Sequence, residues 1–156
     1  MSKKVYIITL LSFIIDQVSK ALVSTCFSLN ESVRLINNFL YLNYINNTGA
    51  SFSILTNKKY LLIVLSLIAI VIIIRYINTF KNTIFNRIGL GLLLGGILGN
   101  LSDRILFGYV KDFISLYIFG YSFPIFNIAD ICIVVGVIIL IISILRGEDK
   151  NGSSSK

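Results

Sequence analysis

Two aspartates, Asp112 and Asp130, are the residues in this chain whose type and position could do chemistry. They are two of only seven acidic residues, and each lies at the edge of a long apolar segment, after the run that ends near Phe107 and before the run 131–145. If both segments cross a bilayer, the intervening connection returns the two carboxylates to the same membrane face. Two neighbouring carboxylates do not readily ionise together, so one stays protonated while the other acts as a base. Such a pair can hydrolyse a peptide bond, because the base activates water and the acid polarises the carbonyl.

Asparagines accompany acids on both of these apolar segments. Asn100 precedes Asp103 by three residues, with Arg104 next to the acid, and Asn127 precedes Asp130 by the same spacing. One interpretation of the second pair is a helix cap, in which the asparagine accepts a backbone N–H and the acid favours the positive end of the helix dipole. A cap does not explain the repeat on two helices. From the pattern alone, a polar cluster inside the membrane without catalytic function is favoured over an acid dyad.

A further acid lies in the first apolar segment. Asp16 and Lys20 are four residues apart and therefore share a helix face, with the acid on the N-terminal side, which is the favourable order. Charge at membrane depth is tolerated mainly when it is paired. The favoured interpretation is a mutually neutralised structural pair that faces the other helices, ahead of a direct catalytic role.

The composition places these residues in a membrane protein. The chain is 56% hydrophobic and 13% charged, with a mean hydropathy of +0.88, against roughly 45–50% apolar and about 25% charged residues in soluble domains. The net charge of +7 does not indicate nucleic-acid binding, because the basic residues lie at the ends of apolar runs. The absence of histidine excludes imidazole catalysis and histidine-based metal sites. Cys26 and Cys132 show neither metal-ligand nor disulfide spacing and are expected to pack.

The elements that must position the acids are four membrane helices. We expect a single integral membrane domain over residues 1–146, an all-α fold with a small extracytoplasmic β-cradle, and a disordered cytoplasmic tail over 147–156. The expected spans cover about 5–27, 59–78, 86–107 and 126–146, and the expected outer loops cover 28–58 and 108–125. The first segment resembles a signal peptide, but polar residues interrupt it and no cleavage site follows, so we expect it to be retained.

The first outer loop has its own pattern. Residues 28–58 are rich in strand-forming residues, with a turn signal at Asn47-Thr48-Gly49, which predicts a small sheet or cradle on the membrane surface. Gly49, Ala50 and Ser51 are small enough to let a substrate backbone approach, although a tight turn explains them equally well. In the third span, Gly91, Gly95 and Gly99 are spaced by four, which favours close helix packing.

The basic residues predict the orientation of the chain. Eight lie on one side: Lys3, Lys4, Arg75, Lys81, Arg87, Arg146, Lys150 and Lys156. Five lie on the other: Arg34, Lys58, Lys59, Arg104 and Lys111. The positive-inside rule then predicts cytoplasmic termini and places both candidate acids near the outer face.

The chain resembles the bacterial lipoprotein signal peptidases (signal peptidase II), membrane aspartyl proteases that remove signal peptides from lipid-modified prolipoproteins. The resemblance covers most of the chain, and five short motifs occur in order. They are Asp16-Gln17-x-x-Lys20; Asn47-Thr48-Gly49-Ala50-Ser51-Phe52; Gly95-Gly96-x-x-Gly99-Asn100-x-x-Asp103-Arg104; Gly108-x-Val110-x-Asp112-Phe113; and Phe123-Pro124-x-Phe126-Asn127-x-Ala129-Asp130, with Gly136 beyond. Each motif is weak alone, but the ordered set is highly specific.

The resemblance implies that Asp112 and Asp130 form the catalytic dyad. It implies supporting or substrate-binding roles for Asn47, Gly49, Asn100, Asp103, Arg104, Asn127, Asp16 and Lys20. It also implies four membrane helices with a small periplasmic β-structure, no metal and no organic cofactor. The expected partners are a lipidated prolipoprotein and the phospholipid bilayer, with no nucleic acid, and the expected state is a monomer in the bacterial inner membrane.

One residue departs from the family pattern. Lys111 stands beside Asp112 where an apolar residue is more usual, and a neighbouring cation is expected to lower the pKa of that acid.

A different class of function remains as the alternative. A small transporter could use the polar residues of the spans as a path through the bundle, but transporters more often show internal repeats with midplane polar residues. The acids here gather toward one face, and the sequence shows no repeat. A structural scaffold subunit is a third possibility, but that function does not explain the acids near the outer face.

Overall fold

Four long helices and one antiparallel sheet make up the part of the chain that the structure describes, residues 2–49 and 55–148 of a computed structural model. The helices are α1 (Ser2–Cys26), α2 (Lys59–Tyr76), α3 (Ile84–Leu106) and α4 (Ile128–Leu145). Each is long and apolar enough to cross a membrane. They occupy the four apolar segments identified in the sequence, with ends that differ by at most three residues.

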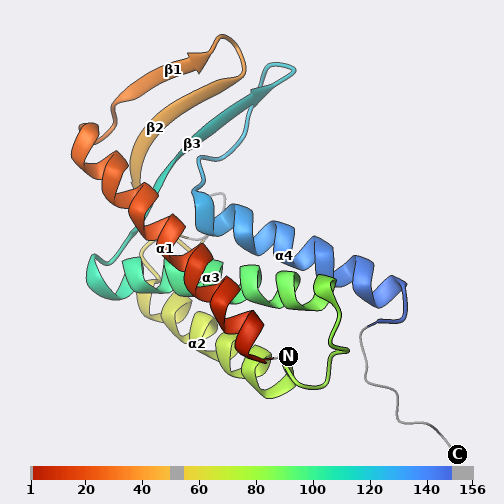
Figure 1. Cartoon of the computed structure of the whole chain (residues 1–156). Helices are drawn as coiled ribbons and strands as arrows, with labels where there is room; N and C mark the ends of the chain where they lie inside the picture. Colours follow the sequence, from red (N-terminus) through yellow and green to blue (C-terminus); the bar gives the residue numbers. More distant parts are fainter. Residues whose placement is uncertain (1, 50–54, 149–156) are drawn as a thin grey trace, which may run out of the picture.

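The helices pack around α3, which contacts both α1 and α4 and is the most buried of the four (Figure 1). Its glycines make these contacts close. A Cβ on Gly91 would lie 2.6 Å from the Ile8 side chain, and one on Gly95 would overlap Ser12 of α1. The predicted small-residue face therefore packs against α1, as expected from the absence of side-chain bulk. In contrast, α2 exposes most of its surface and lies at the edge of the bundle.

The sheet has four antiparallel strands in the order β1-β2-β3-β4. The strands are β1 (Ser32–Ile36), β2 (Leu40–Asn47), β3 (Val110–Ile118) and β4 (Tyr121–Ser122). The predicted β-structure of residues 28–58 is present as β1 and β2. The second half of the sheet, β3 and β4, lies within residues 108–125, for which the sequence predicts only an outer loop, so the chain is not all-α.

The sheet joins the bundle where α1 and α3 end (Figure 1). Val23 of α1, Tyr44 of β2 and Phe113 of β3 form a buried apolar cluster at this junction. A second cluster at the opposite end joins Val5 of α1, Ile77 after α2, and Leu90 and Leu94 of α3. The junction of sheet and helices therefore has a packed support, and the candidate acids lie beside it.

Candidate active site

Asp112 lies near the start of β3, where strand alternation turns its side chain inward and leaves it 1% exposed. Two asparagine amides hold its carboxyl group. Asn127 Nδ2 donates to Oδ1 at 2.6 Å, and Asn47 Nδ2, from the end of β2, donates to Oδ2 at 2.8 Å. The antiparallel pairing of β2 with β3 brings Asn47 beside Val110, which places its amide within reach. Residues 65 positions apart thus build one carboxyl site.

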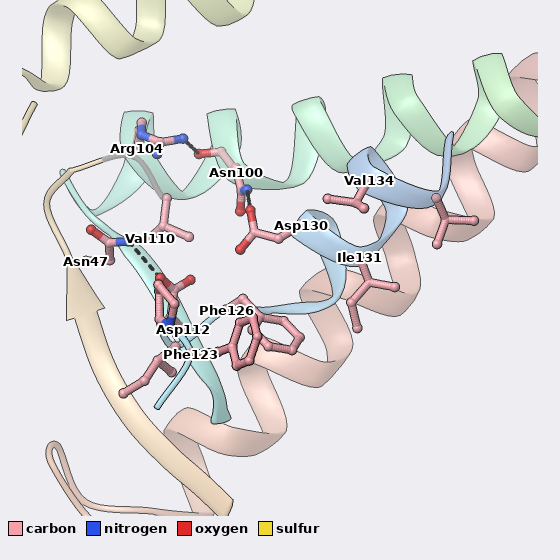
Figure 2. Close-up of a pocket in the computed structure, with 13 residues that line it drawn as sticks. Asn47, Asn100, Arg104, Val110, Asp112, Phe123, Phe126, Asp130, Ile131 and Val134 are labelled. Atoms are coloured by element: carbon pink, nitrogen blue, oxygen red, sulfur yellow. Dashed lines mark hydrogen bonds between the residues drawn. The ribbon is translucent and has the colours of Figure 1, made fainter. Parts of the chain in front are cut away.

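Asp130 lies in the first turn of α4 and closes a capping box with Asn127. The Asn127 side chain accepts from the Asp130 N–H at 2.9 Å, and the Asn127 N–H donates to Asp130 Oδ2 at 3.2 Å. The helix cap considered for this pair is therefore present. It does not exclude a second task, because Asp130 Oδ1 also accepts from Asn100 Nδ2 of α3 at 2.8 Å, as Figure 2 shows.

The amide of Asn100 is oriented by a buried lysine. Asn100 Oδ1 accepts from Lys20 Nζ at 2.9 Å and from Asn127 Nδ2 at 3.1 Å. Because an ammonium group can only donate, it must face the amide oxygen, and the amide NH₂ is left to donate to Asp130. Lys20 thereby orients the neutral amide of Asn100, which in turn donates a hydrogen bond to Asp130.

The ion pair predicted between Asp16 and Lys20 is present, and it includes a third residue. Lys20 Nζ lies 2.9 Å from Asp16 Oδ2 and 3.2 Å from Asp103 Oδ2, and all three side chains are buried. Buried charges are costly unless they are paired and hydrogen-bonded. Gln17 adds donors to both acids, at 3.0 Å to Asp16 and 3.4 Å to Asp103.

Each of the two buried acids also holds the backbone beside a candidate catalytic acid. Asp16 Oδ1 accepts from the N–H of Ala129 at 2.8 Å, and Ala129 directly precedes Asp130. Asp103 Oδ2 accepts from the N–H of Lys111 at 3.1 Å, and Lys111 directly precedes Asp112. The charged group at the centre of the bundle therefore fixes α4 and β3 against α1 and α3.

Arg104 connects α3 with the loop that follows β2. Its Nη2 donates to the Gly49 carbonyl at 2.9 Å, and its Nη1 donates to the Asn100 carbonyl at 3.3 Å. Gly49 N in turn donates to the Asn47 side chain at 2.8 Å, which makes the predicted turn at the strand end. The rest of the predicted loop motif, Ala50 to Phe52, lies outside the described residues.

These groups surround a cavity of about 460 Å³ between β3, α3 and α4 (Figure 2). Its polar side is formed by Asn47, Asn100, Arg104, Asp112 and Asp130. Its apolar side is formed by Val110, Phe123, Pro124, Ile125, Phe126, Ile131, Val134 and Val135. The cavity can therefore hold an apolar chain against two carboxyl groups.

The environment of Asp112 favours its protonated form. Burial, and then the nearby charge of Asp130, raise the pKa of Asp112 to about 7, although the hydrogen bonds from Asn47 and Asn127 and the charge of Lys20 act in the opposite direction. The lowering expected from Lys111 is wrong. The alternation of β3 directs the Lys111 ammonium away from Asp112, to 4.3 Å from the centre of the Phe107 ring and 3.4 Å from Ser24 Oγ.

Comparison with known proteins identifies the family. A family model described as signal peptidase (SPase) II matches residues 8–146. The chain belongs to the signal peptidase II family. Two curated relatives of this peptidase family, both named lipoprotein signal peptidase, support the assignment. The protein of Staphylococcus haemolyticus is 39% identical over 96% of this chain and 99% of its own length. That of Moorella thermoacetica is 43% identical over 94% and 95%.

Solved structures agree with the fold of this signal peptidase II chain. One, described as a bacterial membrane enzyme determined by the in meso method at 2.3 Å resolution, has a TM-score of 0.86 and 33% identity, over 100% of this chain and 96% of its own. Another of the same description at 1.9 Å has a TM-score of 0.82 and 35% identity, over 94% and 95%. With its four apolar helices, the chain is a multi-pass bacterial membrane protein.

The structure brings every sequence-predicted site residue of this signal peptidase II chain into one connected group. The apolar wall of the cavity was not predicted from the sequence. Its segment 123–126 appeared only inside a motif, while Ile131, Val134 and Val135 follow Asp130 at spacings of one, four and five, which place them on neighbouring parts of one helix face. That spacing could have indicated the cavity wall, but α4 is apolar on all sides, so the spacing does not distinguish these residues from the rest of the helix. Gln17 was likewise noted only within a motif.

Proposed function

We propose that this chain is an aspartic endopeptidase that removes the signal peptide from lipid-modified prolipoproteins, cleaving before the diacylglyceryl-cysteine. The observation that carries the proposal is the shared cavity, in which Asp112 and Asp130 lie on a polar side that faces a wall of apolar side chains. The family membership and the name of the two curated relatives supply the substrate class.

The two acids take different roles in the proposed mechanism. Asp130, with its carboxylate at the positive end of α4, accepts a proton from water. Asp112, whose pKa is raised to about 7, donates its proton to the scissile carbonyl as the water oxygen attacks the carbon. The proton on Asp130 then passes to the amine as the C–N bond breaks, and Asp112 takes back a proton from one hydroxyl of the tetrahedral intermediate, which becomes the new carboxyl group. Because the acids are coupled, they titrate as a pair.

The other site residues position this pair. Asn47, Asn100 and Asn127 hold the carboxyl groups, while Asp16, Lys20 and Asp103 fix the elements that carry them. Arg104, which lines the cavity, holds the Gly49 carbonyl of the loop after β2. None of these roles requires a metal or an organic cofactor.

We further propose that the enzyme is a monomer in the bacterial inner membrane, with both termini in the cytoplasm and the dyad near the outer face. In this arrangement the sheet lies on the outer membrane surface and forms the cradle. Most of the tail predicted to be disordered, residues 149–156, lies outside the described residues.

The proposal is tested with purified enzyme in lipid vesicles and a diacylglyceryl-modified prolipoprotein. Wild type should cleave the lipidated substrate but not the same protein without lipid. Asp112→Asn and Asp130→Asn should each lower the rate at least about a hundredfold, because each removes one acid–base group.

Glu31→Gln is the matched control, since it neutralises an exposed acid in the loop before β1. It should cleave at the wild-type rate, and all variants should retain the wild-type unfolding temperature within a few degrees. Cleavage near the wild-type rate by either dyad variant would refute the dyad, and cleavage of the unlipidated protein would refute the substrate class.

A further inference from the structure

The turn between β3 and β4 presents an unusual residue at its apex. Phe119 is fully exposed, and its φ of +50° lies in the left-handed region that bulky side chains avoid. Gly120 follows with φ +79°, and Ile118 pairs with Tyr121, so this is a two-residue turn with positive φ at both central positions. Such turns favour Asn-Gly. The turn itself does not account for phenylalanine.

Phe119 belongs to a group of exposed aromatic residues, which we define as the aromatic tip: Phe39, Phe119 and Tyr121. The N–H of Tyr117 donates to the Phe39 carbonyl at 2.8 Å, so the β1–β2 turn lies beside the end of β3. Figure 1 shows both turns at the end of the sheet farthest from the helices. The aromatic tip is therefore one surface built from two hairpins.

The direction of the sheet determines what this surface meets. In the view of Figure 1 the strands rise obliquely from the ends of α1 and α3, across the direction of α3 and α4 rather than in line with it. If the helices cross the bilayer, the sheet overlies the lipid beside them. Val18 and Leu22 of α1 are also exposed apolar residues and would then face the lipid.

The charge of the surrounding segments fits the same environment. Residues 32–59 and 113–129 contain no acidic residue, and the first segment carries Arg34, Lys58 and Lys59. Basic residues near a membrane surface are attracted to anionic lipid headgroups, and aromatic side chains favour the interfacial layer.

We propose that the aromatic tip inserts into the headgroup region of the bilayer, with Phe119 as its anchor. The anchor holds the segment that continues into the cavity wall, because β4 leads directly to Phe123 and Phe126. It thereby sets the height of the cavity wall relative to the lipid. The inference depends on the four membrane helices and not on the proposed proteolysis.

The chain contains no tryptophan, so a single introduced indole reports its own surroundings. Full-length Phe119→Trp is reconstituted in vesicles of phosphatidylcholine and phosphatidylglycerol, with bromines at defined depths of the lipid chains. Its emission should shift to the blue relative to a tryptophan analogue in water, bromines near the headgroups should quench it most, and aqueous iodide should quench it weakly. Tyr60→Trp, an exposed site in the first turn of α2, is the comparison for a helix-borne indole.

A second pair of variants separates anchoring from folding. Tyr121→Trp is measured with and without Phe119→Asn, which restores the favoured Asn-Gly turn and should keep the hairpin folded. Quenching of the indole at position 121 by brominated lipid should fall when Phe119 is replaced. Unchanged quenching would overturn the anchor role of Phe119.

Two outcomes of the Phe119→Trp measurement would overturn the insertion itself. Strong iodide quenching without bromine quenching would place the tip in water. Weak quenching by both would mean that protein covers it. None of these readouts uses the protease activity, so failure here leaves the proposed function standing.

Discussion

Asp112 and Asp130 each depend on a buried acid that never reaches the cavity. Asp16 and Asp103 bind the N–H groups of Ala129 and Lys111, the residues directly before the two candidate acids. A hydrogen bond to a backbone amide positions the whole turn or strand that follows, which a contact to a flexible side chain would not do. The precision of the proposed dyad therefore comes from the two buried carboxylates that Lys20 pairs at the centre of the bundle.

The pH dependence of cleavage follows from the environment of Asp112. Its pKa is raised to about 7, so the proton that the mechanism requires is present below that pH and lost above it. We expect the rate to decline on the alkaline side with a midpoint near pH 7. Asn47→Ala removes a hydrogen bond that lowers this pKa, so the alkaline decline should move to higher pH.

Rates at saturating substrate from pH 5 to 9 measure both effects, with Glu31→Gln as the control whose profile should match wild type. A decline that stays in place in Asn47→Ala, or moves to lower pH, would contradict the assigned role of Asp112.

At the scale of the elements, α3 is the helix on which the site is assembled. One glycine face of α3 packs against α1, and a second packs against α4. At the second contact a Cβ on Gly136 of α4 would lie 2.8 Å from the carbonyl oxygen of Gly89 of α3. Close approach on both sides lets the short side chains of Asn100 and Asp103 reach across to three other elements. A wider spacing would place these amides and carboxylates beyond hydrogen-bonding distance.

Gly96→Ala tests this spacing where it affects Asp130. The new Cβ would overlap the Ala129 carbonyl oxygen and lie 2.8 Å from Ile133 Cγ1. Overpacking of this kind costs about 1–3 kcal/mol and would displace the start of α4. We expect a lower unfolding temperature in detergent and a lower cleavage rate in the folded enzyme.

Ala21→Val provides the comparison, because it adds bulk to an exposed position of α1 and should leave both quantities unchanged. Wild-type stability and activity in Gly96→Ala would show that the helices have room at this contact.

For the whole molecule, the two ends of the helix bundle differ in structure. One end joins the sheet and the cavity. At the other end Asn86 donates to the carbonyls of Lys81 and Glu148, and accepts from Ser143, which ties the end of α4 to the start of α3. The excess of basic residues lies at this second end, which agrees with a cytoplasmic location under the positive-inside rule.

Cysteine labelling tests this orientation in intact cells. In a background with Cys26→Ser and Cys132→Ala, a cysteine is introduced at Asn37, in the β1–β2 turn, or at Thr79, in the connection between α2 and α3. A membrane-impermeant maleimide should label the first variant directly and the second only after permeabilisation. The reverse pattern would invert the proposed topology, and cleavage activity in each variant confirms that the chain has folded.

The sequence by itself determined the four apolar helices, the β-structure before α2 and the family. Membrane helices satisfy all their backbone hydrogen bonds within one segment, so hydropathy along the chain suffices to predict them. The sequence also indicated the candidate site residues, because they occur in short motifs, but it did not indicate their contacts. The tertiary structure decided how these residues meet, because Asp16 reaches Ala129 and Lys20 reaches Asn100 across 113 and 80 positions. It likewise decided that residues 110–118 form a strand and that Lys111 turns away from Asp112, since a strand acquires its partner and its faces only when the sheet assembles.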